Sequence, residues 1–278
     1  DIELGYRQKI RNIDFHAGIT ASYGWNKVIK KDYAENALPI DIPEGKSQSY
    51  IVGYRFDKIL RTQEDLDAFK AQYPEYKIGG NSPALGMMVF KDLSGPDGTP
   101  DGTISSHDRD ILYDKHFPVV LGLNLGGEWK GFSVDMMFAG EIGYKKSLLS
   151  YADNPANQPY EQLRNWTEWY SNSWTPETPD AWLPKRISNR YRSRATYRNS
   201  SDFWYRNADY LRLRYLNVGY TIPPKLYNKV FDNVKVFFSG KNLFQLSKFG
   251  KKYYDPEIST PWVYPVMATY SFGVDITL

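Results

Sequence analysis

The sequence contains no cysteine among its 278 residues, and its charges are nearly balanced, with 35 Lys and Arg against 32 Asp and Glu. The first absence excludes a disulfide framework, a thiolate nucleophile and any metal site with cysteine ligands. The net charge of +3 is too small for the basic footprint of a nucleic-acid-binding protein. Nucleic acid is therefore not an expected partner.

Long apolar runs and familiar catalytic motifs are also missing. No stretch approaches about 18 consecutive apolar residues, so a transmembrane helix is excluded. The chain has no Gly-x-Ser-x-Gly, P-loop or His-Glu-x-x-His motif, and its histidines, His16, His107 and His116, are scattered. We therefore expect no enzymatic activity and no required cofactor.

Aromatic residues, by contrast, are abundant. They make up 16% of the chain, although the mean hydropathy of −0.57 is that of a water-soluble protein. A transmembrane β-barrel reconciles the two values, because only alternate residues of each strand face lipid and long loops add polar residues.

The clearest pattern lies at the carboxyl end, where every second residue is apolar or aromatic: Ala268, Tyr270, Phe272, Val274, Ile276 and Leu278. A period of two predicts a strand with one apolar face, long enough for the roughly 9–11 residues that a tilted strand needs to cross a bilayer. Within residues 211–222 the apolar side chains shift from odd-numbered to even-numbered positions, which predicts a β-bulge near Tyr215. Six further segments are predicted strands: 2–9, 13–24, 119–125, 132–138, 211–222 and 234–242.

Short and long connections alternate between these strands. Short links at 10–12, 130–131 and 223–233 are followed by long links at 25–117, 143–203 and 244–264. Outer-membrane barrels have short periplasmic turns and long extracellular loops, so a periplasmic carboxyl end places every long link outside. Inside the first loop we expect a ribbon at 48–56 and a helix at 62–73 capped by Thr62. His16 is predicted to face the lumen.

Four segments occur in a specific order: 201–223 (SDFWYRNADYLRLRYLNVGYTIP), 234–249 (VKVFFSGKNLFQLSKF), 255–257 (DPE) and the last strand ending at Leu278. Together they resemble the C-terminal end of SusC/RagA-type outer-membrane importers. Segments 53–69, 92–108 and 174–186 resemble the same family, so the likeness covers nearly the whole chain. The closing pattern of Ser271, Gly273, Ile276 and Leu278 resembles a barrel-assembly signal, although many such barrels end in Phe.

The resemblance implies an all-β, antiparallel transmembrane barrel of about 22 strands in the bacterial outer membrane, with an N-terminal plug. It also implies energy from the TonB complex and a SusD-like surface lipoprotein as a lid, for the uptake of oligosaccharides or peptides. We expect residues 1–278 to be the C-terminal portion of this barrel, without the plug and the N-terminal strands. Open strand edges are not tolerated in lipid, so the remainder of the same barrel must pair with it.

One stretch has the residue order of an EF-hand-like calcium loop, with a sharp turn at Gly102. Its candidate ligands are Asp97, Thr99, Asp101, Thr103 and Asp108. The last position holds Asp in place of Glu, which shortens the reach of that ligand. A solvated Asp/Gly turn is the favoured alternative to a Ca²⁺ site.

Two clusters in the second long loop are candidate contact surfaces. Aromatic faces stack on sugar rings, but packing within the loop is the favoured interpretation of the first cluster. It consists of Trp166, Trp169, Tyr170, Trp174 and Trp182. The second cluster matches lipopolysaccharide phosphates or an acidic partner, or else forms a solvated loop face. It consists of Arg186, Arg190, Arg192, Arg194 and Arg198.

Transport is the leading hypothesis, with the strands as part of a barrel wall and the first two long loops at its external mouth. The alternative is a soluble β-sandwich that binds carbohydrate, in which the apolar face of the last strand would be a buried core. An extracellular hydrolase, a third hypothesis, lacks an identifiable acid and base pair. Exposure of Phe272, Val274 and Ile276 discriminates between the first two.

Overall fold

The computed structural model describes residues 1–113, 117–148, 172–187, 196, 199–227, 231–259 and 263–277. The chain divides into two compact units. Unit 1 contains residues 1–25, 117–146 and 206–278, and unit 2 contains residues 26–116 and 147–205. No helix among the described residues is long and apolar enough to cross a membrane.

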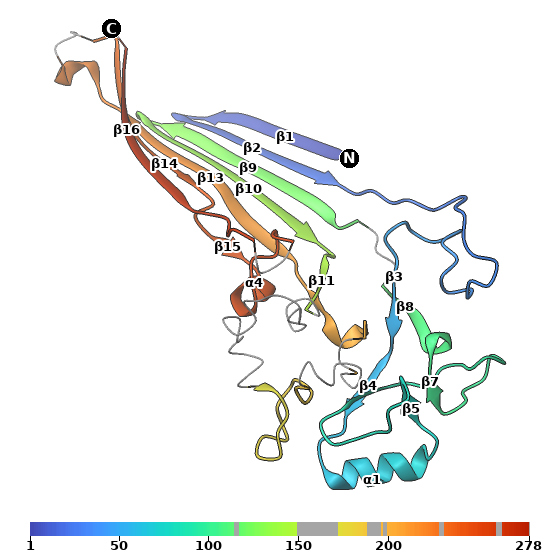
Figure 1. Cartoon of the computed structure of the whole chain (residues 1–278). Helices are drawn as coiled ribbons and strands as arrows, with labels where there is room; N and C mark the ends of the chain where they lie inside the picture. Colours follow the sequence, from blue (N-terminus) through green and yellow to red (C-terminus); the bar gives the residue numbers. More distant parts are fainter. Residues whose placement is uncertain are drawn as a thin grey trace. The chain divides into compact units, whose positions relative to one another are not determined.

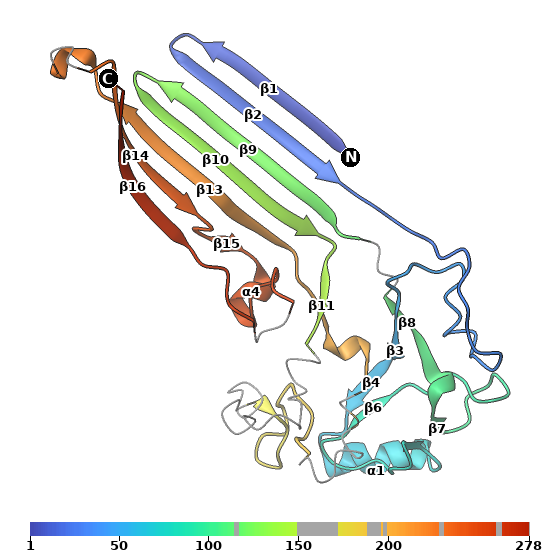
Figure 2. The same cartoon turned by 45° about the horizontal axis from the view of Figure 1, so that its top comes forward.

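Unit 1 is a single antiparallel sheet, which confirms the predicted fold class. Within the described residues, each long strand pairs with the next along the chain, as Figures 1 and 2 show. The long strands are β1 (Ile2–Ile10), β2 (Ile13–Ser22), β9 (Val119–Trp129), β10 (Phe132–Ile142), β13 (Tyr210–Thr221), β14 (Asn233–Lys241) and β16 (Thr269–Thr277). The shorter elements are the 3₁₀ turn at Pro224–Leu226, β15 (Gln245–Leu246), which pairs with β13, and α4 (Lys248–Lys252).

Local chemistry explains where the long strands turn and bend. Lys130 and Gly131, which join β9 to β10, have φ of +48° and +89°, as a two-residue hairpin turn requires. The pairing of β10 with β13 shifts after Met137, opposite Tyr215 and Leu213. Arg214 is therefore the extra residue of a bulge, and the bulge predicted near Tyr215 is confirmed.

One face of the sheet is apolar from edge to edge. A single cross-strand row runs through Ile10, Ile13, Trp129, Phe132, Tyr220, Val236 and Val274. Phe272, Val274 and Ile276 on β16 are 83%, 60% and 51% exposed. The alternative of a β-sandwich is therefore wrong, because it required these side chains to be enclosed between two sheets.

Unit 2 has a hydrophobic core of its own. Its elements are β3 (Ile51–Tyr54), β4 (Phe56–Ile59), α1 (Gln63–Gln72), β5 (Lys77–Ile78), β6 (Met88–Phe90), β7 (Thr103–Ile104), the 3₁₀ turn Ser106–Asp108, β8 (Arg109–Tyr113) and the 3₁₀ turn Asp202–Trp204. Strands β11 (Lys145–Ser147) and β12 (Tyr205–Asn207) pair where the chain passes between the units. Leu60, Met88 and Trp204 are fully buried in this core.

The local structure predicted inside the first loop is confirmed. Thr62 caps α1 by accepting a hydrogen bond from the backbone N–H of Asp65 at 3.1 Å. Leu66 and Phe69 on the inner face of the helix are buried. The predicted ribbon is the antiparallel pair of β3 and β8.

Candidate functional site

The second face of the unit 1 sheet is polar and forms the first candidate site. A cross-strand row on this face runs through Arg7, His16, Gly126, Asp135, Asn217, Ser239 and Ser271. His16 therefore lies on the polar face, as predicted. A wall with lipid-compatible side chains on one side and charged side chains on the other can line an aqueous passage.

Glycines on the polar face let long side chains cross from strand to strand. His16 Nε2 lies 3.3 Å from Asp135 Oδ1 across Gly126. At Gly219, an added Cβ would lie 2.3 Å from Lys235 Cε and 2.8 Å from Ser133 Oγ. The small residues thus make room for contacts between side chains on strands that are not neighbours.

A buried ion cluster joins β13 to the loop that precedes β16. Arg212, whose side chain is only 4% exposed, pairs with Asp255 through Nη2 and with Glu257 Oε2 at 3.0 Å. Arg214, the bulged residue, donates from Nη2 to Glu257 Oε1 at 2.6 Å. The cluster thus fixes the DPE segment (255–257) to strand β13.

Hydrogen bonds outweigh burial at Asp255. Burial alone would raise the pKa of this carboxyl group, but donors from Glu257, Arg212 and Gln245 hold the pKa below its usual value of 3.8. The Glu257 N–H and the Gln245 amide approach Asp255 Oδ1 at 3.0 and 3.1 Å. Asp255 is therefore ionised in the folded protein at neutral pH.

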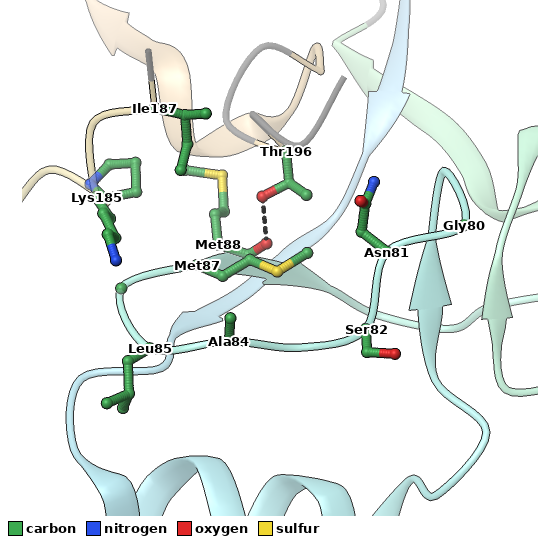
Figure 3. Close-up of a pocket in the computed structure, with 12 residues that line it drawn as sticks. Gly80, Asn81, Ser82, Ala84, Leu85, Met87, Met88, Lys185, Ile187 and Thr196 are labelled. Carbon is green, nitrogen blue, oxygen red and sulfur yellow. Dashed lines mark hydrogen bonds between the residues drawn. The ribbon is translucent and has the colours of Figure 1, made fainter. Parts of the chain in front are cut away.

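Unit 2 contains a cavity of about 420 Å³, shown in Figure 3. Its lining is apolar at Leu85, Met87, Met88 and Ile187 and polar at Asn81, Ser82, Lys185 and Thr196. Thr196 Oγ1 donates to the carbonyl oxygen of Met88 at 2.9 Å, the dashed line in Figure 3. Flexible methionines beside a few fixed polar groups suit a ligand with both apolar and polar parts. Sequence reasoning missed this cavity, because its lining comes from two distant loops.

Close packing around Gly86 builds one wall of this cavity. Gly86 has φ of +75°, and an added Cβ would lie only 2.3 Å from Trp174 Cε3. The Gly86 N–H donates to the carbonyl of Leu60 at 2.7 Å, and its own carbonyl accepts from the Lys185 N–H at 2.7 Å. A glycine is thus required both by the backbone and by the neighbouring ring.

The carboxylates of the predicted calcium loop accept hydrogen bonds mainly from backbone N–H groups. Asp97 Oδ1 accepts from the Thr99 N–H at 3.1 Å, which lowers the pKa of Asp97, and Asp101 Oδ1 accepts from the Thr103 N–H at 2.8 Å. Asp108 is fully buried and accepts from the N–H groups of Leu93, Ser94 and Ser105 at 2.8, 3.1 and 2.7 Å. Among the described residues, no three His, Asp or Glu side chains gather in a metal-binding group. Calcium binding stays a prediction.

Asp92 precedes the predicted calcium loop and binds to it through a contact that the prediction did not include. Its Oδ2 accepts from the Gly102 N–H at 2.6 Å. Burial raises the pKa of Asp92, and the neighbouring carboxylate of Asp108 raises it further. Asp92 therefore fixes the turn at Gly102, whereas Asp108 binds the flanking backbone at Leu93, Ser94 and Ser105.

Only part of the two predicted surface clusters lies in the described residues. Trp174 is buried, and its Nε1 donates to the Arg61 carbonyl at 2.9 Å. Trp182 stacks on Phe203, with ring centroids 6.1 Å apart. Arg186 is also among the described residues. The remaining members lie outside them: Trp166, Trp169, Tyr170, Arg190, Arg192, Arg194 and Arg198. Sugar binding and phosphate binding by these clusters stay predictions.

Comparison with known proteins gives relatives in sequence and in fold. The chain is 27% identical over 210 residues to TonB-dependent receptor P3 of Formosa agariphila, a match that covers 70% of this chain and 19% of the relative. The solved structure of the RagAB peptide transporter matches 99% of this chain and 28% of its own, with a TM-score of 0.67 and 19% identity. The "open-open" state of the RagAB peptide importer matches over the same shares with a TM-score of 0.64. No family model matches the sequence.

These comparisons confirm the resemblance inferred from the sequence, together with the barrel fold and the outer-membrane location. The chain spans about a fifth of the curated relative and 28% of the matched transporter chain. None of the three names describes an enzyme.

Proposed function

Because the chain resembles the C-terminal part of a TonB-dependent transporter in sequence and in fold, we propose that it forms closing strands of an outer-membrane importer. The observation that carries this proposal is the two-faced sheet, apolar across one side and polar across the other. Such a sheet fits a wall between lipid and an aqueous lumen. The protein has no catalytic role in this function.

In this proposal, each connection lies on one side of the membrane. The turns after β1, β9 and β13 are short and face the periplasm, and the chain of unit 2 belongs to the long extracellular connections. The free edges of β1 and β16 pair with the remainder of the same barrel, which also holds the plug. Import is driven by the TonB complex, and a SusD-like lipoprotein closes the outer side.

The cargo is an oligosaccharide or a peptide. RagAB is a peptide transporter by name, which supports a peptide for this chain as well. The cavity beside Met87, Met88 and Lys185 is the candidate contact for cargo in unit 2. Sugar stacking on Trp182, and a structural Ca²⁺ bound by residues of the loop from Asp97 to Asp108, remain part of the proposal.

Uptake by cells tests this function. The full-length gene is deleted and restored, and uptake of labelled oligosaccharides and labelled peptides is compared with and without a protonophore. We expect uptake of one of the two classes to require both the gene and the proton gradient. Equal uptake by the deletion strain would contradict the importer, and loss of the same cargo class on deletion of the lipoprotein gene would identify the lid.

A further inference from the structure

The segment before β3 encloses a second hollow, of about 480 Å³. This segment is the blue trace that precedes β3 in Figure 2. The hollow is lined by one arm that carries three lysines, and by a second arm that contributes Asp41, Pro43 and Tyr50. The lysines are Lys27, Lys30 and Lys31.

The two arms are held together by the backbone and by a fourth lysine. The Val28 N–H donates to the Lys46 carbonyl at 2.9 Å, and the Gly45 N–H donates to the Val28 carbonyl at 2.9 Å. Lys46 Nζ donates to the carbonyls of Pro39 and Ile40 at 2.7 and 3.0 Å. The hollow is therefore a fixed feature of the fold, and Lys46 serves its structure.

The charge inside the hollow is not compensated. Arg109 Nη1 and Nη2 bind both oxygens of Asp41 at 3.0 and 2.6 Å, so this carboxylate is already neutralised. Within the described part of the chain, Lys27, Lys30 and Lys31 form no ion pair, and Asp32 is the remaining carboxylate of the lining. Three ammonium groups beside one free carboxylate favour an anion with more than one negative charge.

Two exposed apolar side chains lie close to the lysines in the sequence. Ile29, between Val28 and Lys30, is 91% exposed. Trp25, two residues before Lys27 in the sequence, is 74% exposed. It comes three residues after the end of β2 and continues the alternation of that strand's apolar residues. Aromatic and aliphatic side chains next to lysines are typical of segments that lie at a membrane surface.

We propose that this hollow binds phosphate groups, and that Lys27, Lys30 and Lys31 hold them. The proposal rests on the importer function insofar as it places the loop on the outer side of the membrane, where phosphorylated lipid headgroups are available. A free phosphate ester offers the same chemistry, so the two sources are separated by experiment.

The test uses the full-length importer purified in detergent micelles. Binding is measured for three probes: bisphosphorylated lipid A in mixed micelles, dephosphorylated lipid A and inorganic phosphate. The variant Lys27→Gln/Lys30→Gln/Lys31→Gln is compared with Lys70→Gln/Lys77→Gln/Lys91→Gln, which removes the same charge from exposed lysines of unit 2 that do not line the hollow. Heat modifiability on gels checks that each barrel is folded.

A lysine near an anionic surface changes binding about fivefold, so the first variant should bind phosphorylated lipid A on the order of a hundredfold more weakly. The second variant should bind as the unchanged protein does. Competition by inorganic phosphate would identify free phosphate as a sufficient ligand, and its absence would identify the lipid headgroup. Equal weakening in both variants, or equal binding of dephosphorylated lipid A, would overturn the site. Uptake is scored separately, so an intact importer without phosphate binding would refute this site alone.

Discussion

His16 on β2 and Asp135 on β10 approach to 3.3 Å although a whole strand lies between them. Both residues are in register with Gly126 on β9. An added Cβ at Gly126 would lie 2.4 Å from His16 Nε2 and 2.6 Å from Asp135 Oδ1. The contact thus ties three strands of the polar face together, and it depends on a missing side chain.

We predict that Gly126→Ala breaks this pair at little cost in stability. The imidazole is the free end of a side chain and can rotate away, and both partners are about half exposed. The free energy of unfolding should fall by less than about 1 kcal/mol, as for other exposed ion pairs. Urea unfolding of the full-length protein in lipid vesicles measures the change. His16→Ala should have a similar effect, and the double variant should be no less stable than either; additive losses would contradict this explanation.

A charge on the apolar face should be far more costly than the same charge one residue away. Leu125 is in register with Met136 and Ala17 on the apolar face, whereas Asn124 lies on the polar face. We expect Leu125→Arg to destabilise the barrel by about 2–4 kcal/mol, because the guanidinium would enter the hydrocarbon layer. Asn124→Arg is the matched control and should change stability little. Folding yield and urea midpoints in vesicles measure both, and equal losses would argue against a lipid-facing surface.

The sheet was predictable because side-chain alternation reports directly on which face a residue occupies. The strands, the bulge beside Tyr215 and the helix capped by Thr62 each follow from local patterns in the sequence. The residues of the ion cluster could also be picked out in the sequence. Arg212 and Arg214 alternate with leucines in a predicted strand, and the DPE segment (255–257) follows downstream.

Pairings between distant segments were not predictable. Nothing local indicates that Arg212 meets Asp255, or that Gly86 packs on Trp174. The spacing of the acidic residues in the predicted calcium loop suggested ligands that converge on an ion. Asp108 instead accepts from the N–H groups of Leu93 and Ser94, which precede that loop. Such contacts depend on tertiary folding, which residue spacing does not encode.

Two glycines with the same backbone conformation should respond differently to alanine. Gly86 and Gly80 have φ of +75° and +76°, but a Cβ would meet Trp174 at Gly86 and open space at Gly80. Gly80→Ala should cost only the backbone strain of about 1–2 kcal/mol. Gly86→Ala should cost more, because it also displaces the buried indole of Trp174. Limited proteolysis of unit 2 in the full-length protein measures the difference, and equal sensitivity would show that the ring packing contributes nothing.

Arg212 should be a main support of the loop before β16. Its side chain is 4% exposed, and Asp255 and Glu257 are only 18% and 11% exposed. Arg212→Ala would leave the largely buried Asp255 without its charged partner and would leave Glu257 with Arg214 alone, a loss of about 3–5 kcal/mol. Arg214→Ala removes a partner that is 35% exposed and should cost clearly less. Hydrogen–deuterium exchange at residues 255–259 measures the release of the loop, and similar exchange in both variants would contradict this ranking.

The same cluster should make the loop sensitive to acid. The pKa of Asp255 is lower in the folded state than its usual value of 3.8, so folding favours the ionised form. The stabilisation is therefore complete above that value, and it is lost as the pH falls from 3.8 through the folded pKa. Exchange at residues 255–259 should rise over this window in the unchanged protein. Asp255→Asn cannot titrate, so the rise should be smaller in that variant; an identical acid response would show that Asp255 does not govern the release of the loop.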